Sequence, residues 1–74
     1  MGTTMDLLDK ALNKRRDLTL SAYSRQLRFH RSALNVALNR GHLSPRLAAA
    51  IARDIGDDWS KWAAIAAMEN NQND

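Results

Sequence analysis

Residues 19–41 read TLSAYSRQLRFHRSALNVALNRG, and this stretch decides the fold. Its first half places apolar or small residues at the spacing i, i+3, i+4 and i+7, namely Leu20, Tyr23, Ser24 and Leu27. Its second half, from about Arg31 to Arg40, carries a similar stripe made of Ala33, Leu34, Ala37 and Leu38. Such spacing places one side of a helix against a core. The stretch therefore predicts two short helices joined by a turn at residues 28–30, with Phe29 and Tyr23 packed inward.

The flanking residues predict three more helices. Side chains that accept hydrogen bonds from the first turn of a helix stand at each expected start: Thr4, Thr19, Ser44, and Asp57 or Asp58. Pro45 suits a first helical position, while Gly41 and Gly56 mark the expected ends of the third and fourth helices. No alternating run of β-branched residues predicts a strand. We expect an all-α, compact five-helix domain over residues 1–68, followed by a flexible polar tail at residues 69–74.

The last helix is apolar around most of its circumference, because residues 62–68 read WAAIAAM. Trp59 and Trp62 are expected to pack against the fourth helix, whose inward residues are Leu47, Ile51 and Ile55. Exposed apolar strips commonly mark association surfaces. We expect Trp62, Ile65 and Met68 to form a homodimer interface, unless the first helix folds over this strip and buries it.

Charge divides the chain into a basic middle and an acidic end. From Lys14 to Arg46 there are eight basic residues and one acid, whereas from Asp54 onward there are five acids and one base. The net charge is +3. This asymmetry suits one surface that faces a polyanion, although a solvated surface with an accidental run of charge explains it equally well.

The outward side of the helix at residues 31–40 is polar without Lys or Glu, the usual residues of a solvated face. It carries Arg31, Ser32, Asn35, Val36 and Asn39. Arginine pairs with guanine, asparagine pairs with adenine, serine is adaptable, and valine contacts the methyl group of thymine. These residue types suit contact with base edges in a major groove, although, taken alone, an ordinary solvated helix face explains them at least as well.

At this point the sequence resembles the phage Cro and repressor family of helix-turn-helix proteins. Residues 18–27 are similar to the first helix of that motif, and residues 30–41, HRSALNVALNRG, are similar to its turn and recognition helix. Ser24 stands where the family has a small residue. Arg28 stands where the family usually has glycine, which implies backbone strain if the position needs a positive φ. The resemblance covers roughly residues 5–60 and implies a lambda-repressor-like fold, with the motif at residues 19–40.

The resemblance also implies which residues contact double-stranded DNA. Base contacts are expected from Arg31, Ser32, Asn35 and Val36. Contacts to the DNA backbone are expected from Thr19, Arg25, Arg28, His30, Asn39 and Arg40. The implied function is a phage or prophage transcriptional repressor that reads a palindromic operator as a homodimer.

Other function classes have less support. No catalytic or metal-ligand spacing is present, so we expect no enzyme activity, cofactor or small-molecule substrate. The absence of cysteine, signal peptide and long apolar run favours a cytoplasmic protein without membrane contact. Two alternatives stay open: an antitoxin-like or excisionase-like factor that binds DNA with a protein partner, and a protein-interaction adaptor that does not bind DNA.

Overall fold

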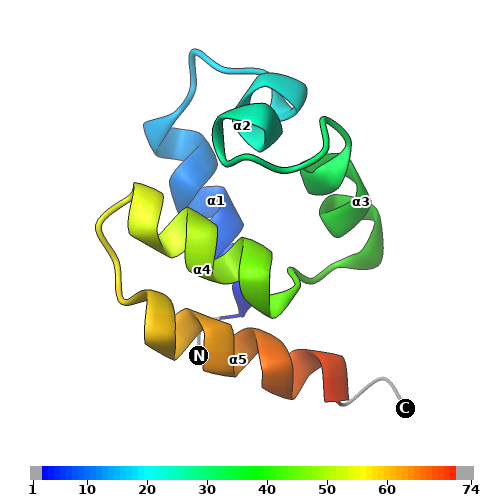
Figure 1. Cartoon of the computed structure of the whole chain (residues 1–74), viewed down its shortest axis with the longest axis vertical. Helices are drawn as coiled ribbons and strands as arrows, with labels where there is room; N and C mark the ends of the chain where they lie inside the picture. The colour runs from blue at the N-terminus through cyan, green and yellow to red at the C-terminus, as the bar shows by residue number, and fades with distance from the viewer. Residues whose placement is uncertain (1–2, 72–74) are drawn as a thin grey trace.

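The five helices of this computed structural model follow one another along the part of the chain that it describes, residues 3–71 (Figure 1). They are α1 (Thr4–Lys14), α2 (Leu20–Gln26), α3 (Ala33–Arg40), α4 (Pro45–Asp54) and α5 (Trp59–Asn71). No strand occurs within these residues. The prediction of an all-α fold is confirmed.

The helices form two groups around one core: α2 packs with α3, and α4 packs with α1 and α5. Figure 1 shows α2 and α3 at one end of the molecule, α5 at the other, and α1 and α4 between them. Helix α4 packs against both α1 and α5, whereas α3 packs mainly on α2. Each helix contributes apolar side chains to the core, among them Leu7, Tyr23, Leu34, Ile51 and Trp62. Burial of one such large side chain stabilises the fold by roughly 1.5–3 kcal/mol.

Local chemistry sets most of the helix boundaries. The Thr19 side chain accepts a hydrogen bond from the Ala22 N–H at 3.0 Å, and Ser44 accepts one from the Leu47 N–H at 3.3 Å. Asp58 accepts hydrogen bonds from two N–H groups in the first turn of α5. The glycines after α3 and α4 have φ values of 80° and 76°, a region that glycine enters without a Cβ penalty. These predicted starts and ends are confirmed.

The N-terminus of α1 differs from the prediction. Thr3 is the N-cap, and Thr4 is the first helical residue and fully buried. The Thr4 backbone N–H and hydroxyl donate to the two carboxylate oxygens of Glu69, at 2.8 and 2.9 Å. The Thr4 hydroxyl oxygen also accepts a hydrogen bond from the Leu43 N–H at 2.9 Å. Thr4 therefore joins α1 to the end of α5 and to the loop before α4.

The same contact corrects the predicted tail. Residues 69–71 continue α5, and the Asn70 side chain donates a hydrogen bond to the Ala66 carbonyl oxygen at 2.9 Å. Glu69 belongs to the folded domain because its carboxylate binds otherwise unpaired donors at the start of α1. The rest of the predicted tail, residues 72–74, lies outside the described residues.

Two side chains predicted to face inward are exposed instead. Leu38 is 43% exposed because α3 rests mainly on α2, which covers only the centre of the apolar stripe. Trp59 is 47% exposed because it is the first residue of α5, at the edge of the contact with α4. The Arg53 guanidinium lies 4.5 Å from the centroid of the Trp59 ring.

A polar cluster ties together α1, α2 and α4. Arg15 donates to both carboxylate oxygens of Asp54, at 3.0 and 3.2 Å, and the Tyr23 hydroxyl donates to the same carboxylate at 2.8 Å. The Tyr23 ring is buried, as predicted, but its hydroxyl is not free. Burial and the neighbouring carboxylate raise the pKa of Tyr23 well above its usual value, so this hydroxyl remains a donor.

The stability of the protein should decline in acid because of Asp54. The hydrogen bond from Arg15, reinforced by the one from Tyr23, lowers the pKa of this carboxyl below its usual value. A carboxyl with a lowered pKa stabilises the fold above its unfolded pKa, and this contribution is lost as pH falls through the folded pKa. We expect thermal melts to show a constant melting temperature near neutral pH and a decline below about pH 4.

A matched pair of variants tests this assignment. Asp54→Asn should lower the melting temperature at neutral pH and make the decline in acid shallower. Asp9→Asn, which changes an exposed carboxylate on α1, should leave both nearly unchanged. An equally steep decline in wild type and Asp54→Asn would show that the Asp54 cluster is not responsible.

None of the helices within residues 3–71 combines the length and the hydropathy needed to cross a bilayer.

Candidate nucleic-acid interface

Ser24 holds α3 against α2. This side chain is fully buried, and its hydroxyl donates to the Leu20 carbonyl oxygen at 2.8 Å while accepting from the Leu34 N–H at 3.1 Å. The Ser24 carbonyl oxygen also accepts a hydrogen bond from the Phe29 N–H at 3.0 Å. A small side chain is needed here because the two helices approach each other closely. The orientation of α3 relative to α2 is thereby fixed.

The turn between these helices contains Arg28 in the left-handed region, with φ at 67°. It is the single non-glycine residue with positive φ within residues 3–71. The position where the resembled family usually has glycine therefore does adopt a glycine-like conformation. A side chain with a Cβ costs roughly 1–2 kcal/mol in this region.

Arg28→Gly should therefore stabilise the protein. We expect a gain of about 1 kcal/mol, or a rise of roughly 4–8 °C in melting temperature for a domain of this size. Gly41→Ala is the reverse change at the other positive φ next to α3. Open space surrounds this glycine, so its φ of 80° is the only feature that disfavours a Cβ. This variant should lower the melting temperature. A melting temperature for Arg28→Gly at or below wild type would contradict the strain assigned to this turn.

The start of α3 lies two residues later than predicted, and His30 provides the reason. The Nδ1 atom of His30 accepts a hydrogen bond from the Ser32 N–H at 3.1 Å and lies 2.8 Å from the Ser32 hydroxyl oxygen. These contacts hold residues 30–32 as a turn, so the helix begins at Ala33. Ser32 is half-buried and engaged with His30, whereas Arg31 is exposed just before the helix.

The outermost side of α3 is polar. Ser32, Asn35 and Asn39 follow one another at i, i+3 and i+7, opposite the buried Leu34 and Ala37. We call these three residues the outer stripe. Both asparagine side chains are exposed. The outer stripe and Arg31 thus form one surface that a partner can approach without displacing any part of residues 3–71.

Val36 and Arg40 lie on the flank of α3 beside a groove. This groove has a volume of about 230 Å³ and separates α3 from the start of α4 and the end of α5. Phe29 and Leu47 line it together with Val36 and Arg40. Val36 is exposed, as predicted for a base contact, but it lies at the edge of the outer stripe rather than within it.

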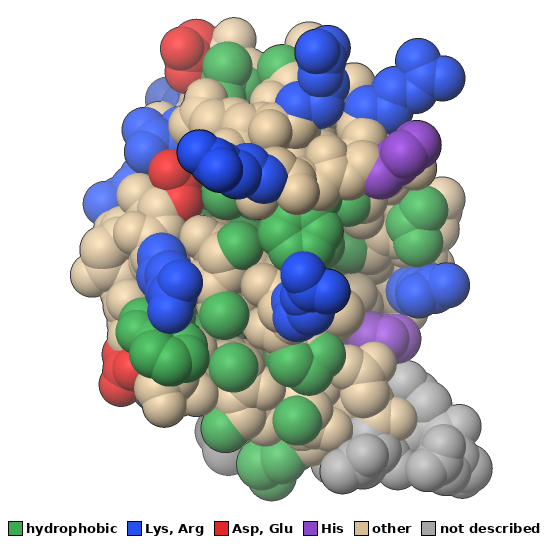
Figure 2. Space-filling view, viewed as in Figure 1, with side chains coloured by type: hydrophobic (Ala, Val, Ile, Leu, Met, Phe, Trp, Pro, Cys, Tyr) green, Lys and Arg blue, Asp and Glu red, His purple; other side chains and the backbone are tan. Residues whose placement is uncertain are grey.

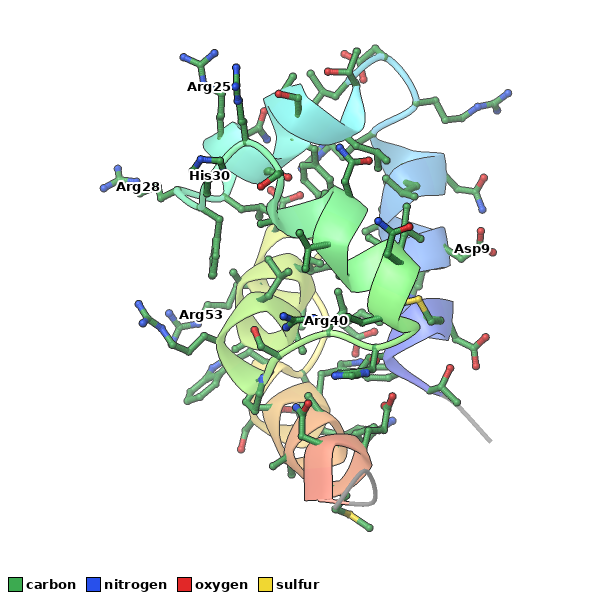
Figure 3. The ribbon with its side chains drawn as sticks, turned by 90° about the vertical axis from the view of Figure 1, so that its right-hand side faces the viewer. Asp9, Arg25, Arg28, His30, Arg40 and Arg53 are labelled. Carbon is green, nitrogen blue, oxygen red and sulfur yellow. The ribbon has the colours of Figure 1, made fainter. Side chains whose placement is uncertain are left out.

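Basic and polar side chains lie beside α3, on the end of α2 and the following turn. The predicted backbone-contacting residues Arg25, Arg28 and His30 are exposed and project to one side from the end of α2 and the following turn (Figure 3). Asp9 points to the opposite side of the molecule in the same view. On the face drawn in Figure 2, the visible Asp and Glu side chains lie along one edge, while Lys and Arg side chains spread across the rest. The electrostatic surface near α2 and α3 therefore favours an anion.

The remaining residue predicted to contact the DNA backbone, Thr19, is exposed. Its hydroxyl oxygen accepts the N-cap hydrogen bond of α2.

The predicted association surface on α5 is only partly as expected. Trp62 is 8% exposed and packs into the protein's own core, as expected from its predicted contact with the fourth helix, so little of its side chain is left for a dimer interface. The reason is that Trp62 and Ala66 form the side of α5 that faces α4. Met68 is 64% exposed, and Ile65 is half-buried. Ala64 and Ala67 are exposed beside Met68 and were not among the predicted interface residues. Their spacing from Met68, four residues and one residue earlier in a helix, was the signal that could have identified them.

Comparisons with protein-family models, with curated proteins and with solved structures find no match to this chain.

Proposed function

We propose that this protein is a sequence-specific DNA-binding transcriptional regulator of the phage repressor type, with α2, the turn and α3 as a lambda-repressor-like helix-turn-helix motif. One observation carries the proposal: a short helix, fixed on α2 through Ser24, presents Asn35 outward, with Arg31 exposed just before the helix and beside a cationic turn. A propped helix with polar side chains of this kind is a common means of reading a major groove. The strained but exposed Arg28 supports the same function, because strain often persists where a side chain is needed.

Affinity and discrimination come from different residues in this proposal. Arg25, Arg28 and Arg40 bind phosphates, which supplies affinity that decreases with salt. Arg31 and Asn35 contact base edges, which supplies preference for one sequence. Ser32 assists mainly by ordering the start of α3 with His30.

The regulator acts as a homodimer through the exposed side of α5. Met68, Ala64 and Ala67 form an apolar strip at the end of the molecule away from α2 (Figure 1). The longest dimension of the molecule is 33 Å. Two copies joined at this end hold their α3 helices apart on either side of the interface, as binding in successive major grooves, ~34 Å apart on one side of DNA, requires. A palindromic operator matches this symmetry.

Selection of binding sites from random duplex DNA, at low and at physiological salt, tests the proposed function. We expect a palindromic motif whose half-sites are about one helical turn apart, together with affinity that falls steeply with salt. Enrichment of no motif and no salt-sensitive binding would refute DNA recognition.

Met68→Glu should disrupt the homodimer. A carboxylate in an apolar contact between copies loses its hydration, so we expect dissociation to monomers with little change in melting temperature of the monomer itself. Sedimentation equilibrium measures this, and Asp9→Lys, at an exposed position on α1, serves as a charge-changing control. A wild-type protein that stays monomeric on its palindromic site and instead co-purifies with an unrelated chain would favour a factor with a protein partner.

A further inference from the structure

The structure aligns Asn39 with Asn35, although the sequence placed Asn39 at the DNA backbone. The outer stripe runs from Ser32, just before α3, through Asn35 to Asn39. Asn35 and Asn39 are one turn apart and exposed on the same side of the helix. Leu38 and Val36 lie on the two flanks, so the two amides form the centre of the surface that faces a partner.

The length of α3 allows both amides to reach base edges. Its 8 residues span only about 12 Å along the axis, and the roughly 10–12 Å diameter of a helix matches the ~12 Å width of the major groove. The whole helix therefore fits in the groove, including the turn that carries Asn39. A helix of many more turns would leave the groove at its C-terminal end, where side chains meet phosphates instead.

The chemistry of the amide selects the base. Asparagine offers one acceptor and one donor side by side, which matches the N6 donor and N7 acceptor of adenine in the major groove. Residues 18–53 contain no carboxylate, so this surface has no Asp or Glu to accept a hydrogen bond from cytosine N4. Four residues of helix correspond to a rise of about 6 Å, close to two base-pair steps of ~3.4 Å.

We propose that Asn35 and Asn39 each pair with an adenine, so that every operator half-site carries two adenines about two base pairs apart. This inference rests on the proposed function, and it adds the identity of two bases in the half-site. Asn39 is a specificity-determining residue in this account, equivalent in kind to Asn35.

Replacement of single adenines by 7-deazaadenine in the selected operator tests the inference with the wild-type protein. This base keeps its Watson–Crick pairing but lacks the N7 acceptor. We expect the dissociation constant to rise roughly 3- to 10-fold at two adenines about two base pairs apart, and hardly at all at other adenines. Fluorescence anisotropy of labelled duplexes measures these changes.

Variants assign each adenine to its residue. Asn35→Ala should abolish the sensitivity to one 7-deazaadenine position, and Asn39→Ala should abolish the sensitivity to the other. Asn13→Ala, which removes an exposed asparagine from α1, should retain both sensitivities. A palindromic motif with one sensitive adenine or none would overturn this inference and leave the proposed function standing. Absence of any salt-sensitive duplex binding would overturn the proposed function itself.

Discussion

Asn35→Ala should weaken binding to the preferred operator by roughly 5- to 150-fold while leaving binding to random duplex DNA nearly unchanged. The exposed amide lies in the middle of the outer stripe, where the proposed function pairs it with a base edge and where it contributes little to the fold. Loss of one such pair removes about 1–3 kcal/mol of discrimination against the wrong base. Titrations of the variant with the selected operator and with random DNA, at the same salt concentration, measure the difference.

Arg25→Ala provides the matched comparison for this result. Arg25 is exposed in the last turn of α2 and binds phosphate in the proposal, so a change there should weaken binding to all sequences alike and reduce the salt dependence. Equal losses on the operator and on random DNA for Asn35→Ala would place this side chain at the backbone and contradict base recognition by α3.

Ser24→Leu should lower the free energy of unfolding by about 2–5 kcal/mol, a large share of the stability of a small domain. The added volume cannot fit between α2 and α3, where Ser24 is fully buried. The variant also leaves the Leu34 N–H without the hydroxyl that accepts its hydrogen bond. Urea denaturation followed by circular dichroism measures the loss, and DNA binding should fail together with the packing of α3.

Two controls separate volume from hydrogen bonding. Ser24→Ala removes the acceptor without adding volume and should cost only about 1–2 kcal/mol. Ala22→Leu adds the same bulk on the exposed side of α2 and should cost almost nothing. If Ser24→Leu were as stable as Ala22→Leu, the close approach of α2 and α3 would not be what positions the outer stripe.

Features that depend on neighbouring residues could be predicted from the sequence. Thr19, Ser44 and Asp58 cap helices because an N-cap side chain needs only the next two or three N–H groups. Gly41 could be predicted to follow α3 because the end of a helix often needs a residue with positive φ, and glycine adopts that conformation without a Cβ penalty. The small residue at Ser24 and the unusual residue at Arg28 were also visible in the pattern.

Features that depend on distant residues could not be predicted in this way. Glu69 looked like part of a polar tail because its partner, Thr4, is 65 positions away. Trp59 and Leu38 followed the helical period correctly, but their exposure depends on where the neighbouring helices end. Helical periodicity gives the direction of a side chain and does not say whether another element covers it.

The candidate site shows the same division. The exposure of Arg31 and Asn35 followed from the period of α3, since residues opposite a buried stripe face outward. The alignment of Asn39 with Asn35 followed from the same period, because residues four apart lie one turn apart on one side of a helix. The contact between His30 and Ser32, which determines where α3 begins, could not be predicted. Trp62 was expected both to pack on the fourth helix and to join an interface, because residues 62–68 are apolar around most of the helix; in the structure it lies in the core.

The central claim is that the outer stripe of α3 lies in the major groove, and nuclear magnetic resonance of the isotopically labelled protein tests it most directly. On titration with the selected operator, the side-chain amide signals of Asn35 and Asn39 and the backbone signal of Arg31 should shift most, while the signals of the core residues of α5 stay in place. Large shifts confined to α1 or α5, with these three signals unchanged in the presence of bound DNA, would contradict the account.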